Sequence, residues 1–349
     1  MKVVLVGPVS PFKGGIAHFN TCISKELERS IHSFRVVSWR RRFPKLFYPG
    51  KNEYNITEKY LFADRDKYVL DILNPITWLR ASRKILEIEP DTVIFNFISP
   101  LLAPVLLVLL TRVRSSISKS RKIQLIAICH NATPHKSRLG DKFITKLCLS
   151  RFDTIMVHSQ SELESIQAIL RKSQQQIILG FHPVYSFFKD ELVRRNIRQE
   201  LGIKSNVILY FGIIRPYKGV EFLIRAMYEV IQEVNCVLLI VGEIWEGREE
   251  IFELIEKLGL SQHIVVVDRY VPDYDVGNYF IDSDLVVLPY LSATQSGISQ
   301  IAVSFEKYIV STDVGGLRDV MAGYSHMDLV KAYCPKSIAR AVILSLIHI

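Results

Sequence analysis

Short apolar runs alternate with longer amphipathic segments along the whole chain. The apolar runs are continuous and rich in Val, Ile and Leu, which is typical of strands that are buried on both faces of a parallel sheet. The segments between them repeat apolar residues at helical spacing. The predicted strands are Val3–Val6, Arg35–Ser38, Thr92–Asn96, Gln124–Ile128, Thr154–Val157, Gln176–Leu179, Val207–Phe211, Val237–Val241, Ile264–Val267, Leu285–Leu288 and Tyr308–Ser311. The predicted helices are Ile16–Arg29, Ile76–Glu87, Lys142–Leu149, Glu221–Gln232 and Glu249–Leu258.

This pattern restarts near residue 205, after the polar, proline-containing segment His182–Lys204. A chain of 349 residues is long enough for two domains with separate cores. We therefore predict an α/β protein with two doubly wound, Rossmann-like domains, residues 1–182 and 183–349, and a hinge within Gly180–Ser205. Ligands of such sheets bind at the carboxyl ends of the strands, so the expected site is a cleft between the domains.

Two apolar segments have to be distinguished from targeting or membrane sequences. The opening MKVVLVGP has four apolar residues before Gly7, which indicates a first strand and not a signal peptide. The run Phe97–Leu110 contains two prolines and is shorter than the roughly 20 residues that a membrane-spanning helix needs. We expect this run to be a buried helix.

The charge and the cysteines narrow the choice of partner and compartment. The net charge of +9 points to an acidic partner: a phosphate-bearing small molecule, an anionic membrane surface or a nucleic acid. Nucleic acid is disfavoured, because the aromatic residues lie mostly in strand-like and core-like segments. The five cysteines are scattered without a C-x-x-C pair, which favours a reducing cytoplasm over a zinc site or a disulfide framework.

The segment YFGIIRPYKGVEFLIRA, residues 210–226, places two cations between a predicted strand and a helix that we expect to begin at about Lys218. The strand ends at Gly212, and Arg215 and Lys218 follow on the loop. Helix-start N–H groups and two cations suit a diphosphate. The loop is not a Walker A motif, because Lys precedes Gly and no Ser or Thr follows. A solvated basic turn is the alternative.

Two more loops follow predicted strands. Gly14 and Gly15 follow the first strand, where adjacent glycines allow a phosphate or a sugar to approach the backbone; an ordinary flexible turn is the alternative. His130 follows the strand Gln124–Ile128, at a position where an imidazole can bond a hydroxyl group or a developing charge; a structural hydrogen bond is the alternative.

Taken together, these motifs resemble glycosyltransferase family 4, the "group 1" retaining transferases of GT-B fold. The resemblance covers nearly the whole chain, and it is carried by GPVSPFKGGIAHF, by HNATPH at 130–135, by GIIRPYKGVEFLIRA at 212–226, by the block from VGEIWEG to ATQSGISQIA, and by TDVGGL at 312–317. It implies a GT-B fold, an acceptor-binding N-terminal domain, a nucleotide-sugar-binding C-terminal domain, and transfer of a sugar from a nucleotide diphosphate donor with its anomeric configuration retained.

The resemblance also implies roles for individual residues. Arg215 and Lys218 would hold the donor diphosphate, His130 would touch the donor sugar near the reacting carbon, and these three are the expected catalytic residues. Gly15 would face the phosphates and the acceptor, and the loop Arg269–Pro272 would face the nucleobase. The expected donor-binding residues are Gly14, Gly15, Gly212, Glu243, Tyr270, Val271, Gln295, Ser296 and Gly297.

One departure from the family pattern concerns its two glutamates, which are eight positions apart. Alignment on Thr312–Gly316 puts Ala293 and Ile301 at those positions, within the variant sequence Ala-Thr-Gln-Ser-Gly at 293–297. Hydrogen-bonding side chains at a helix start, with the N–H groups around Gly297, still suit a phosphate. The missing glutamates bear on the identity of the donor sugar and on activity.

Two acidic pairs have metal-like spacing. Asp282 and Asp284 form a D-x-D, but Asp284 leads into an apolar strand and we expect it to act as a strand-start residue. Asp273 and Asp275 are expected to cap a short helix. No metal and no cofactor is predicted, because the two cations can stabilise the departing diphosphate. Glycoside hydrolysis, in contrast, needs two positioned carboxyl groups.

Basic, aromatic-containing segments at 39–51 and 111–122 are either a contact for an anionic membrane, which would bring the enzyme to a lipid-linked acceptor, or a solvated basic face. Family members normally end with a long helix that crosses back to the N-terminal domain, whereas this chain stops in the first helix after Pro335. We therefore expect a sequence truncated at its C-terminus.

The sequence thus predicts a cytoplasmic, metal-independent, retaining glycosyltransferase of the hexosyltransferase type, peripheral to the inner face of the cell membrane, in surface polysaccharide or glycolipid synthesis. Its partners would be a nucleotide-sugar donor and a glycan or lipid-linked acceptor. Two alternatives stay open: a non-catalytic nucleotide-sugar-binding subunit, and a nucleotide-sugar 2-epimerase, which would need carboxylates for proton transfer where the predicted loops offer few beyond Glu243.

Overall fold

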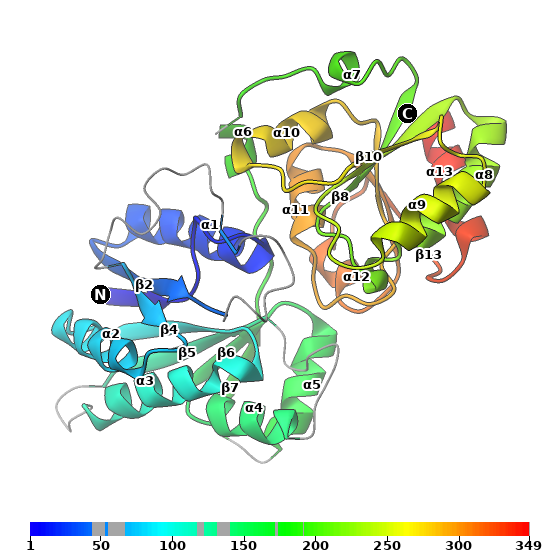
Figure 1. The fold of residues 1–349 in the computed structure, drawn as a ribbon. Helices are drawn as coiled ribbons and strands as arrows, with labels where there is room; N and C mark the ends of the chain where they lie inside the picture. The colour runs from blue at the N-terminus through cyan, green and yellow to red at the C-terminus, as the bar shows by residue number, and fades with distance from the viewer. Residues whose placement is uncertain are drawn as a thin grey trace. The chain divides into compact units, whose positions relative to one another are not determined.

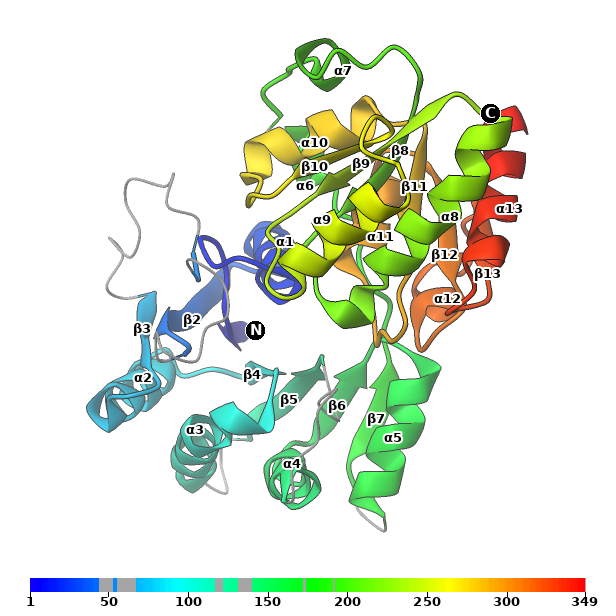
Figure 2. The ribbon, with the colours of Figure 1, turned by 45° about the vertical axis from the view of Figure 1, so that its right-hand side comes forward.

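The structure is a computed structural model, and it describes residues 1–43, 53–54, 67–116, 122–130, 140–171, 174–190 and 192–348. Contacts divide the chain into two compact units, Met1–His182 and Pro183–Ile349. Each unit contains one parallel sheet with helices on its faces (Figures 1 and 2). The α/β, GT-B-like architecture of two doubly wound sheets that the sequence predicts is confirmed in each unit.

The N-terminal unit has a seven-stranded parallel sheet in the order β3-β2-β1-β4-β5-β6-β7. Every strand predicted in this region is present, with small differences at the ends. The edge strand β3 was not predicted, because it is only four residues long and a single one of them is fully buried. The strands are β1 (Lys2–Val6), β2 (Ser33–Arg41), β3 (Tyr68–Asp71), β4 (Thr92–Phe97), β5 (Gln124–Cys129), β6 (Thr154–Val157) and β7 (Gln176–Leu179).

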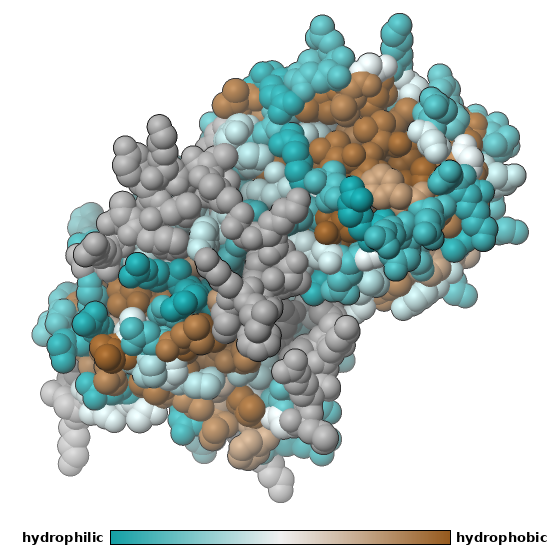
Figure 3. Space-filling model, in the orientation of Figure 1, coloured by the Kyte–Doolittle hydropathy of each residue, from teal (hydrophilic) through white to brown (hydrophobic). Residues whose placement is uncertain are grey.

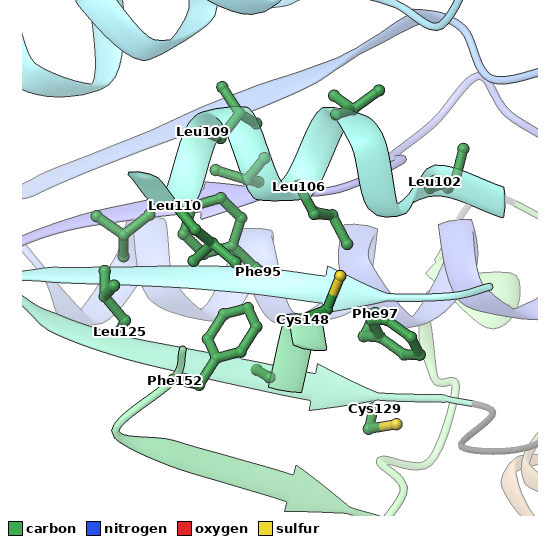
Figure 4. Close-up of a cluster of buried hydrophobic side chains, with 14 of the residues drawn as sticks. Phe95, Phe97, Leu102, Leu106, Leu109, Leu110, Leu125, Cys129, Cys148 and Phe152 are labelled. Carbon is green, nitrogen blue, oxygen red and sulfur yellow. The ribbon is translucent and has the colours of Figure 1, made fainter. Parts of the chain in front are cut away.

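Helices cover both faces of this sheet. α1 lies on one face, whereas α2, α3 and α4 lie on the other, as Figures 1 and 2 show. The larger part of the core lies under α3, where Leu106 of the helix and Phe95 of β4 belong to one buried cluster (Figure 4). The helices are α1 (Gly15–Ser30), α2 (Pro75–Glu87), α3 (Ala103–Ser115), α4 (Asp141–Leu149) and α5 (Gln160–Leu170).

The sequence predicts one buried helix for the apolar run Phe97–Leu110, and this prediction is wrong. The first residue of the run ends β4, a 3₁₀ turn follows at Pro100–Leu102, and α3 begins at Ala103. The Ser99 side chain accepts a hydrogen bond from the Leu101 N–H at 3.3 Å and so starts the turn. A buried strand and a buried helix share the same apolar composition, so composition alone did not reveal the boundary between them.

The C-terminal unit has a six-stranded parallel sheet in the order β10-β9-β8-β11-β12-β13. The strands predicted in this region are present. The edge strand β13 was not predicted, because its sequence MDLV alternates and one of its residues is fully buried. The strands are β8 (Asn206–Phe211), β9 (Cys236–Val241), β10 (Ile264–Val267), β11 (Leu285–Leu288), β12 (Tyr308–Thr312) and β13 (Met327–Val330).

In this unit α8, α9 and α13 lie on one face of the sheet, and α10 and α11 lie on the other (Figures 1 and 2). α13 packs against α8, and it buries Ile338 and Val342. Hydrophilic side chains cover the outward side of α9 in Figure 3, as its amphipathic pattern requires. The helices are α6 (Phe187–Asp190), α7 (Ile197–Glu200), α8 (Val220–Glu233), α9 (Arg248–Lys257), α10 (Asp273–Ile281), α11 (Gly297–Ser304), α12 (Leu317–Val320) and α13 (Pro335–His348).

Two further features concern the cysteines and the length of the apolar helices. The five cysteines are all free thiols, and Cys129, Cys148 and Cys236 are buried. Burial raises the pKa of Cys148 and of Cys236 to about 11, so both stay protonated and inert near neutral pH. Within the described ranges, none of the helices combines the length and the apolar character that crossing a membrane requires.

Candidate functional site

The loops that follow β8 and β9 touch through their main chains. Gly212 follows β8 and Gly242 follows β9, and both have positive φ angles, 117° and 148°. A Cβ atom at Gly242 would lie 2.0 Å from the Gly212 carbonyl oxygen, so any side chain there would force the two loops apart. The predicted donor-binding residue Gly212 is therefore part of a tightly packed layer at the carboxyl ends of the strands.

Two more loops join this layer. A Cβ atom at Gly219 would lie 2.0 Å from the carbonyl oxygen of Pro289, which follows β11. A Cβ atom at Gly315, after β12, would lie 1.7 Å from the carbonyl oxygen of Ala293. The loops after β8, β9, β11 and β12 thus lie against one another at a single edge of the sheet. This edge is where doubly wound sheets bind their ligands.

Arg215 lies on the β8–α8 loop, as predicted, immediately before a 3₁₀ turn at Pro216–Lys218. Its guanidinium group forms an ion pair with Glu246 at 3.1 Å, and it lies 5.1 Å from the centre of the Trp245 ring. The side chain is about one-third exposed. The aromatic contact and the ion pair hold the guanidinium in a defined place while one side of it faces solvent.

Lys218 lies at the end of the same turn. Its ammonium group is 3.6 Å from the centre of the Tyr290 ring and 5.4 Å from that of Tyr217. Burial, opposed in part by Tyr217 and reinforced by the nearby Arg215, lowers the pKa of Lys218 to about 8, so the side chain is charged at neutral pH and loses its charge in mild alkali. A cation over an aromatic face is stabilised without being neutralised, and it can still attract an anion.

The helix after this loop starts later than predicted. α8 begins at Val220 and not at Lys218, because Gly219 adopts a left-handed conformation (φ 65°) between the 3₁₀ turn and the helix. Both cations consequently precede the helix, where the unpaired N–H groups of its first turn point outward.

The predicted residues Gln295, Ser296 and Gly297 lie at the start of α11. Ser296 is the N-cap: its buried hydroxyl group accepts a hydrogen bond from the Ser299 N–H at 3.3 Å. The same hydroxyl is 3.3 Å from the Tyr290 hydroxyl group, and burial raises the pKa of Tyr290 to about 12. Tyr290 therefore connects the Lys218 ammonium group to the start of α11.

The other predicted donor residues take up defined but separate positions. Glu243 is buried, and its carbonyl oxygen accepts a hydrogen bond from the Ile214 N–H at 3.0 Å. Tyr270 donates a hydrogen bond to Asp273 at 3.3 Å, while Val271 is buried beside it. Ala293 and Ile301, which stand where the resembling family carries glutamates, are both buried apolar side chains.

The acidic residues have structural partners. Asp282 accepts hydrogen bonds from Arg194 and from the Ile197 N–H, and Asp284 accepts one from the Val207 N–H at 2.7 Å at the start of β8. The expectation that Asp273 and Asp275 cap a helix is wrong. α10 has no side-chain cap, and buried Asp275 instead pairs with arginines. Among the described residues, no group of three or more His, Cys, Asp or Glu is arranged to hold a metal ion.

In the N-terminal unit, His130 follows β5 as predicted and is buried. Its Nε2 atom donates a hydrogen bond to the Asn96 side-chain oxygen at 2.6 Å. The remainder of the HNATPH motif lies outside the described residues. Gly14, with a φ of 103°, and Gly15 begin α1, and a Cβ atom at either position would meet no other atom within 4 Å.

Two further histidines, which were not predicted from the sequence, lie beside His130. The imidazole ring of His158 is 5.6 Å from that of His130 and 5.7 Å from that of His182. All three rings contact Phe19 of α1 at 4.9–5.2 Å, edge to face. We call these three histidines and Phe19 the histidine cluster. The position of His158 directly after the β6 run was a usable signal in the sequence.

Burial and proximity keep His130 and His158 uncharged near neutral pH. Burial, followed by the repulsion of His158 and His182, holds the pKa of His130 well below its usual range. Burial, followed by the repulsion of His182, lowers the pKa of His158 to about 4. His130 and His158 are consequently neutral rings, and a neutral imidazole can donate one hydrogen bond and accept another.

Parts of both predicted basic segments are engaged in ion pairs. Arg42 and Glu53 form a buried pair at 2.7 Å, Arg41 is bound to Asp71, and Arg114 is bound to Asp153 at 2.6 Å. Residues 44–51 of the first segment and 117–121 of the second lie outside the described residues. These described arginines therefore stabilise the fold, whereas Arg40 and Arg112 are exposed.

Comparisons with known proteins show which sequences and structures the chain resembles. Residues 205–347 match the family model described as glycosyl transferases group 1. The chain is 32% identical over 105 residues to a GDP-mannose:glycolipid 4-beta-D-mannosyltransferase of Xanthomonas campestris pv. campestris, covering 30% of this chain and 29% of the relative. It is 29% identical over 145 residues to a D-inositol 3-phosphate glycosyltransferase of Segniliparus rotundus, covering 40% of this chain and 32% of the relative.

The fold matches along its whole length. The crystal structure of Anabaena HepE in complex with UDP and glucose superposes with a TM-score of 0.69 at 16% identity, covering 99% of this chain and 90% of that one. The chain therefore has the GT-B fold. The segments that align span only 29–56% of the lengths of the curated relatives.

Proposed function

We propose that this chain, a group 1 glycosyltransferase by its residues 205–347, transfers a sugar from a nucleoside diphosphate sugar to a glycan or a lipid-linked acceptor with retention of configuration. The relative from Xanthomonas is named for a GDP-mannose donor and a glycolipid acceptor, and the HepE structure holds UDP and glucose. Both names support a nucleoside diphosphate sugar as the donor here.

The observation that carries this proposal is the pair of cations on the loop after β8. Arg215 and Lys218 occupy the carboxyl edge of the sheet, before the first turn of α8 and in the same layer as the start of α11. A diphosphate leaving group needs its growing negative charge stabilised, and a unit charge pair at about 4 Å contributes about 4 kcal/mol at an effective dielectric constant of 20. Two cations and two helix starts supply this stabilisation.

In the reaction that we propose, the leaving phosphate accepts the proton of the attacking hydroxyl group, so no pair of catalytic carboxylates is required. His130 would contact the donor sugar as a neutral hydrogen-bonding group. We propose no metal for this step, since Arg215 and Lys218 provide positive charge where the diphosphate departs. The exposed Arg40 and Arg112 support a contact with an anionic membrane, on which a lipid-linked acceptor would be found.

The first experiment is a thermal-shift panel of UDP, GDP, ADP, CMP and their sugars. It compares the parent chain, Lys218→Ala, and the control Lys257→Ala, which removes an exposed lysine of α9. A ligand at 100 times its dissociation constant stabilises the folded state by about 2.7 kcal/mol. We expect one nucleoside diphosphate to raise the melting temperature of the parent and the control but not that of Lys218→Ala. If no nucleotide stabilises a parent chain that melts cooperatively, the donor site is refuted.

A non-catalytic subunit that binds nucleotide sugars is the second candidate, and the apolar Ala293 and Ile301 favour it. The two functions differ in turnover. An enzyme consumes the nucleotide sugar in the presence of an acceptor extract and releases the nucleoside diphosphate, which a coupled assay detects. Binding without release would support the subunit.

A further inference from the structure

Asn96 and His130 come from neighbouring strands. Asn96 lies near the carboxyl end of β4, and His130 directly follows β5, which pairs with β4. Both side chains are nearly inaccessible, at 3% and 1% exposed, and their contact is 2.6 Å long. A short, buried contact of this kind needs one donor and one acceptor. Because the amide oxygen is an acceptor, the imidazole nitrogen Nε2 must carry the hydrogen.

The orientation of the Asn96 amide is set by the main chain. Its nitrogen donates a hydrogen bond to the Val6 carbonyl oxygen on β1, at 3.5 Å. A flipped amide would place two acceptor oxygens against each other at Val6, so the observed orientation is the favourable one. The amide oxygen is therefore directed at His130.

Gly7, which follows β1, leaves the space that this amide occupies. A Cβ atom at Gly7 would lie 2.4 Å from the Asn96 amide nitrogen and 3.0 Å from its Cγ atom. These distances are shorter than contacts that real side chains make, so a methyl group at residue 7 would displace Asn96. The position of the amide consequently depends on a glycine at this place.

The His130 ring carries one hydrogen and not two. Burial and the neighbouring rings of His158 and His182 hold the pKa of His130 well below its usual range. Asn96 is a neutral partner, so it does not stabilise an imidazolium as a carboxylate would. In a neutral ring with hydrogen on Nε2, the acceptor lone pair is on Nδ1.

We propose that Asn96 is a positioning residue that holds His130 as the neutral Nε2–H tautomer, in which Nδ1 is the acceptor atom of the ring. The tautomer stands on the geometry of the N-terminal unit alone, whereas its effect on sugar transfer rests on the proposed function. Asn96 acts through His130 and is not itself catalytic.

Nuclear magnetic resonance of the histidine-¹⁵N-labelled chain tests the tautomer directly. The two ring nitrogens of His130 are assigned by comparison with His130→Gln and are read at neutral pH. We expect a protonated Nε2 and an unprotonated Nδ1. An imidazolium ring, or a hydrogen on Nδ1, would overturn the proposal without any measurement of activity.

A matched pair of variants separates the hydrogen bond from the packing. Asn96→Asp keeps the acceptor oxygen toward His130 and loses only the N–H that bonds Val6, so the Nε2–H tautomer should persist and the pKa of His130 should rise. Asn96→Leu has a similar volume without the acceptor, so the tautomer should become mixed. Gly7→Ala should resemble Asn96→Leu because it displaces the amide. If the ring of His130 is unchanged in Asn96→Leu, Asn96 has no positioning role. If Asn96→Leu does not fold, the spectra of the parent and of Asn96→Asp still decide whether His130 is the Nε2–H tautomer.

Measurements of enzyme activity add a readout that a change in packing alone would not affect. Asn96→Leu should lower kcat by about tenfold, the typical effect of losing one buried hydrogen bond. Its affinity for nucleoside diphosphate should be unchanged, because the cations proposed for the diphosphate lie in the other unit. The kcat/KM profile of Asn96→Asp should lose activity at a higher pH on its acid side. A parent chain without turnover, but with the Nε2–H tautomer, would refute the proposed function and leave the tautomer standing.

Discussion

Basic side chains are buried in both units, but they differ in charge. We compare the histidine cluster of the N-terminal unit with the cation loop of the C-terminal unit, residues 212–219. In the cluster, three imidazoles surround Phe19, and burial with mutual repulsion keeps His130 and His158 neutral. In the loop, Lys218 lies over the face of Tyr290, and its pKa of about 8 leaves it charged at neutral pH.

The difference follows from the starting pKa of each group and from its neighbours. A downward shift of about two to three units leaves lysine, whose ordinary pKa is about 10.4, charged at pH 7, whereas histidine starts at about 6.5 and becomes fully neutral. The face of the Tyr290 ring attracts the ammonium group and so favours the charged form of Lys218. The same burial thus leaves neutral imidazoles in one unit and a positive charge in the other.

The largest expected effect is acid destabilisation through the histidine cluster. His158 has a pKa of about 4 in the folded chain, and an unfolded histidine titrates at about 6.5. Between these values the unfolded state binds more protons, so the free energy of unfolding falls as the pH falls from about 6.5 to about 4, by about 3 kcal/mol in total. Above pH 6.5 this contribution is complete.

Urea melts at pH 7, 6 and 5 check this, and the tryptophans offer a selective probe. Trp39 and Trp78 lie in the N-terminal unit and Trp245 lies in the other, so fluorescence in a Trp245→Phe background reports the N-terminal unit. His158→Gln should weaken the pH dependence, whereas the exposed control His32→Gln should not. Equal slopes for both variants would mean that His158 is not the titrating group.

The next effect concerns the charge of Lys218. If this ammonium group binds diphosphate, the affinity for the matching nucleoside diphosphate should fall above about pH 8, approaching tenfold per pH unit, because the neutral amine predominates there. Isothermal titration calorimetry at pH 7, 8 and 9 measures this dependence.

Two variants of Lys218 sharpen that test. Lys218→Arg should bind with little dependence on pH in this range, since a guanidinium group stays charged. Lys218→Met should bind weakly at every pH, by about 10- to 100-fold, the typical loss for one charged hydrogen bond. A parent affinity that is constant from pH 7 to 9 would contradict the assignment of Lys218.

The smallest expected effect concerns the ion pair of Arg215. Both partners are partly exposed, so the pair with Glu246 contributes at most about 1 kcal/mol. Glu246→Gln removes a competing carboxylate and should tighten the binding of nucleoside diphosphate by about two- to fivefold. Glu249→Gln, an equal charge change at the start of α9, controls for net charge. An equal effect of both variants would show that Arg215 is not involved.

The sequence by itself determined the elements and the ends of the strands where ligands bind. Buried parallel strands need unbroken apolar runs, so the pattern revealed every strand except the edge strands β3 and β13, whose burial is incomplete. The predicted strand ends also located the loops. Arg215, Lys218 and His130 were therefore assigned correctly to loops that follow strands. These features depend on residues that are close in sequence.

Only the tertiary structure decided which of these loops meet. Asn96 and His130 are 34 positions apart, and Tyr290 meets Lys218 from a loop after another strand, β11. Such contacts depend on the order of strands in each sheet, which a pattern of apolar residues does not encode. The charges of the histidines and of Lys218 depend in turn on those contacts, because desolvation and neighbouring groups, and not residue type alone, set a pKa.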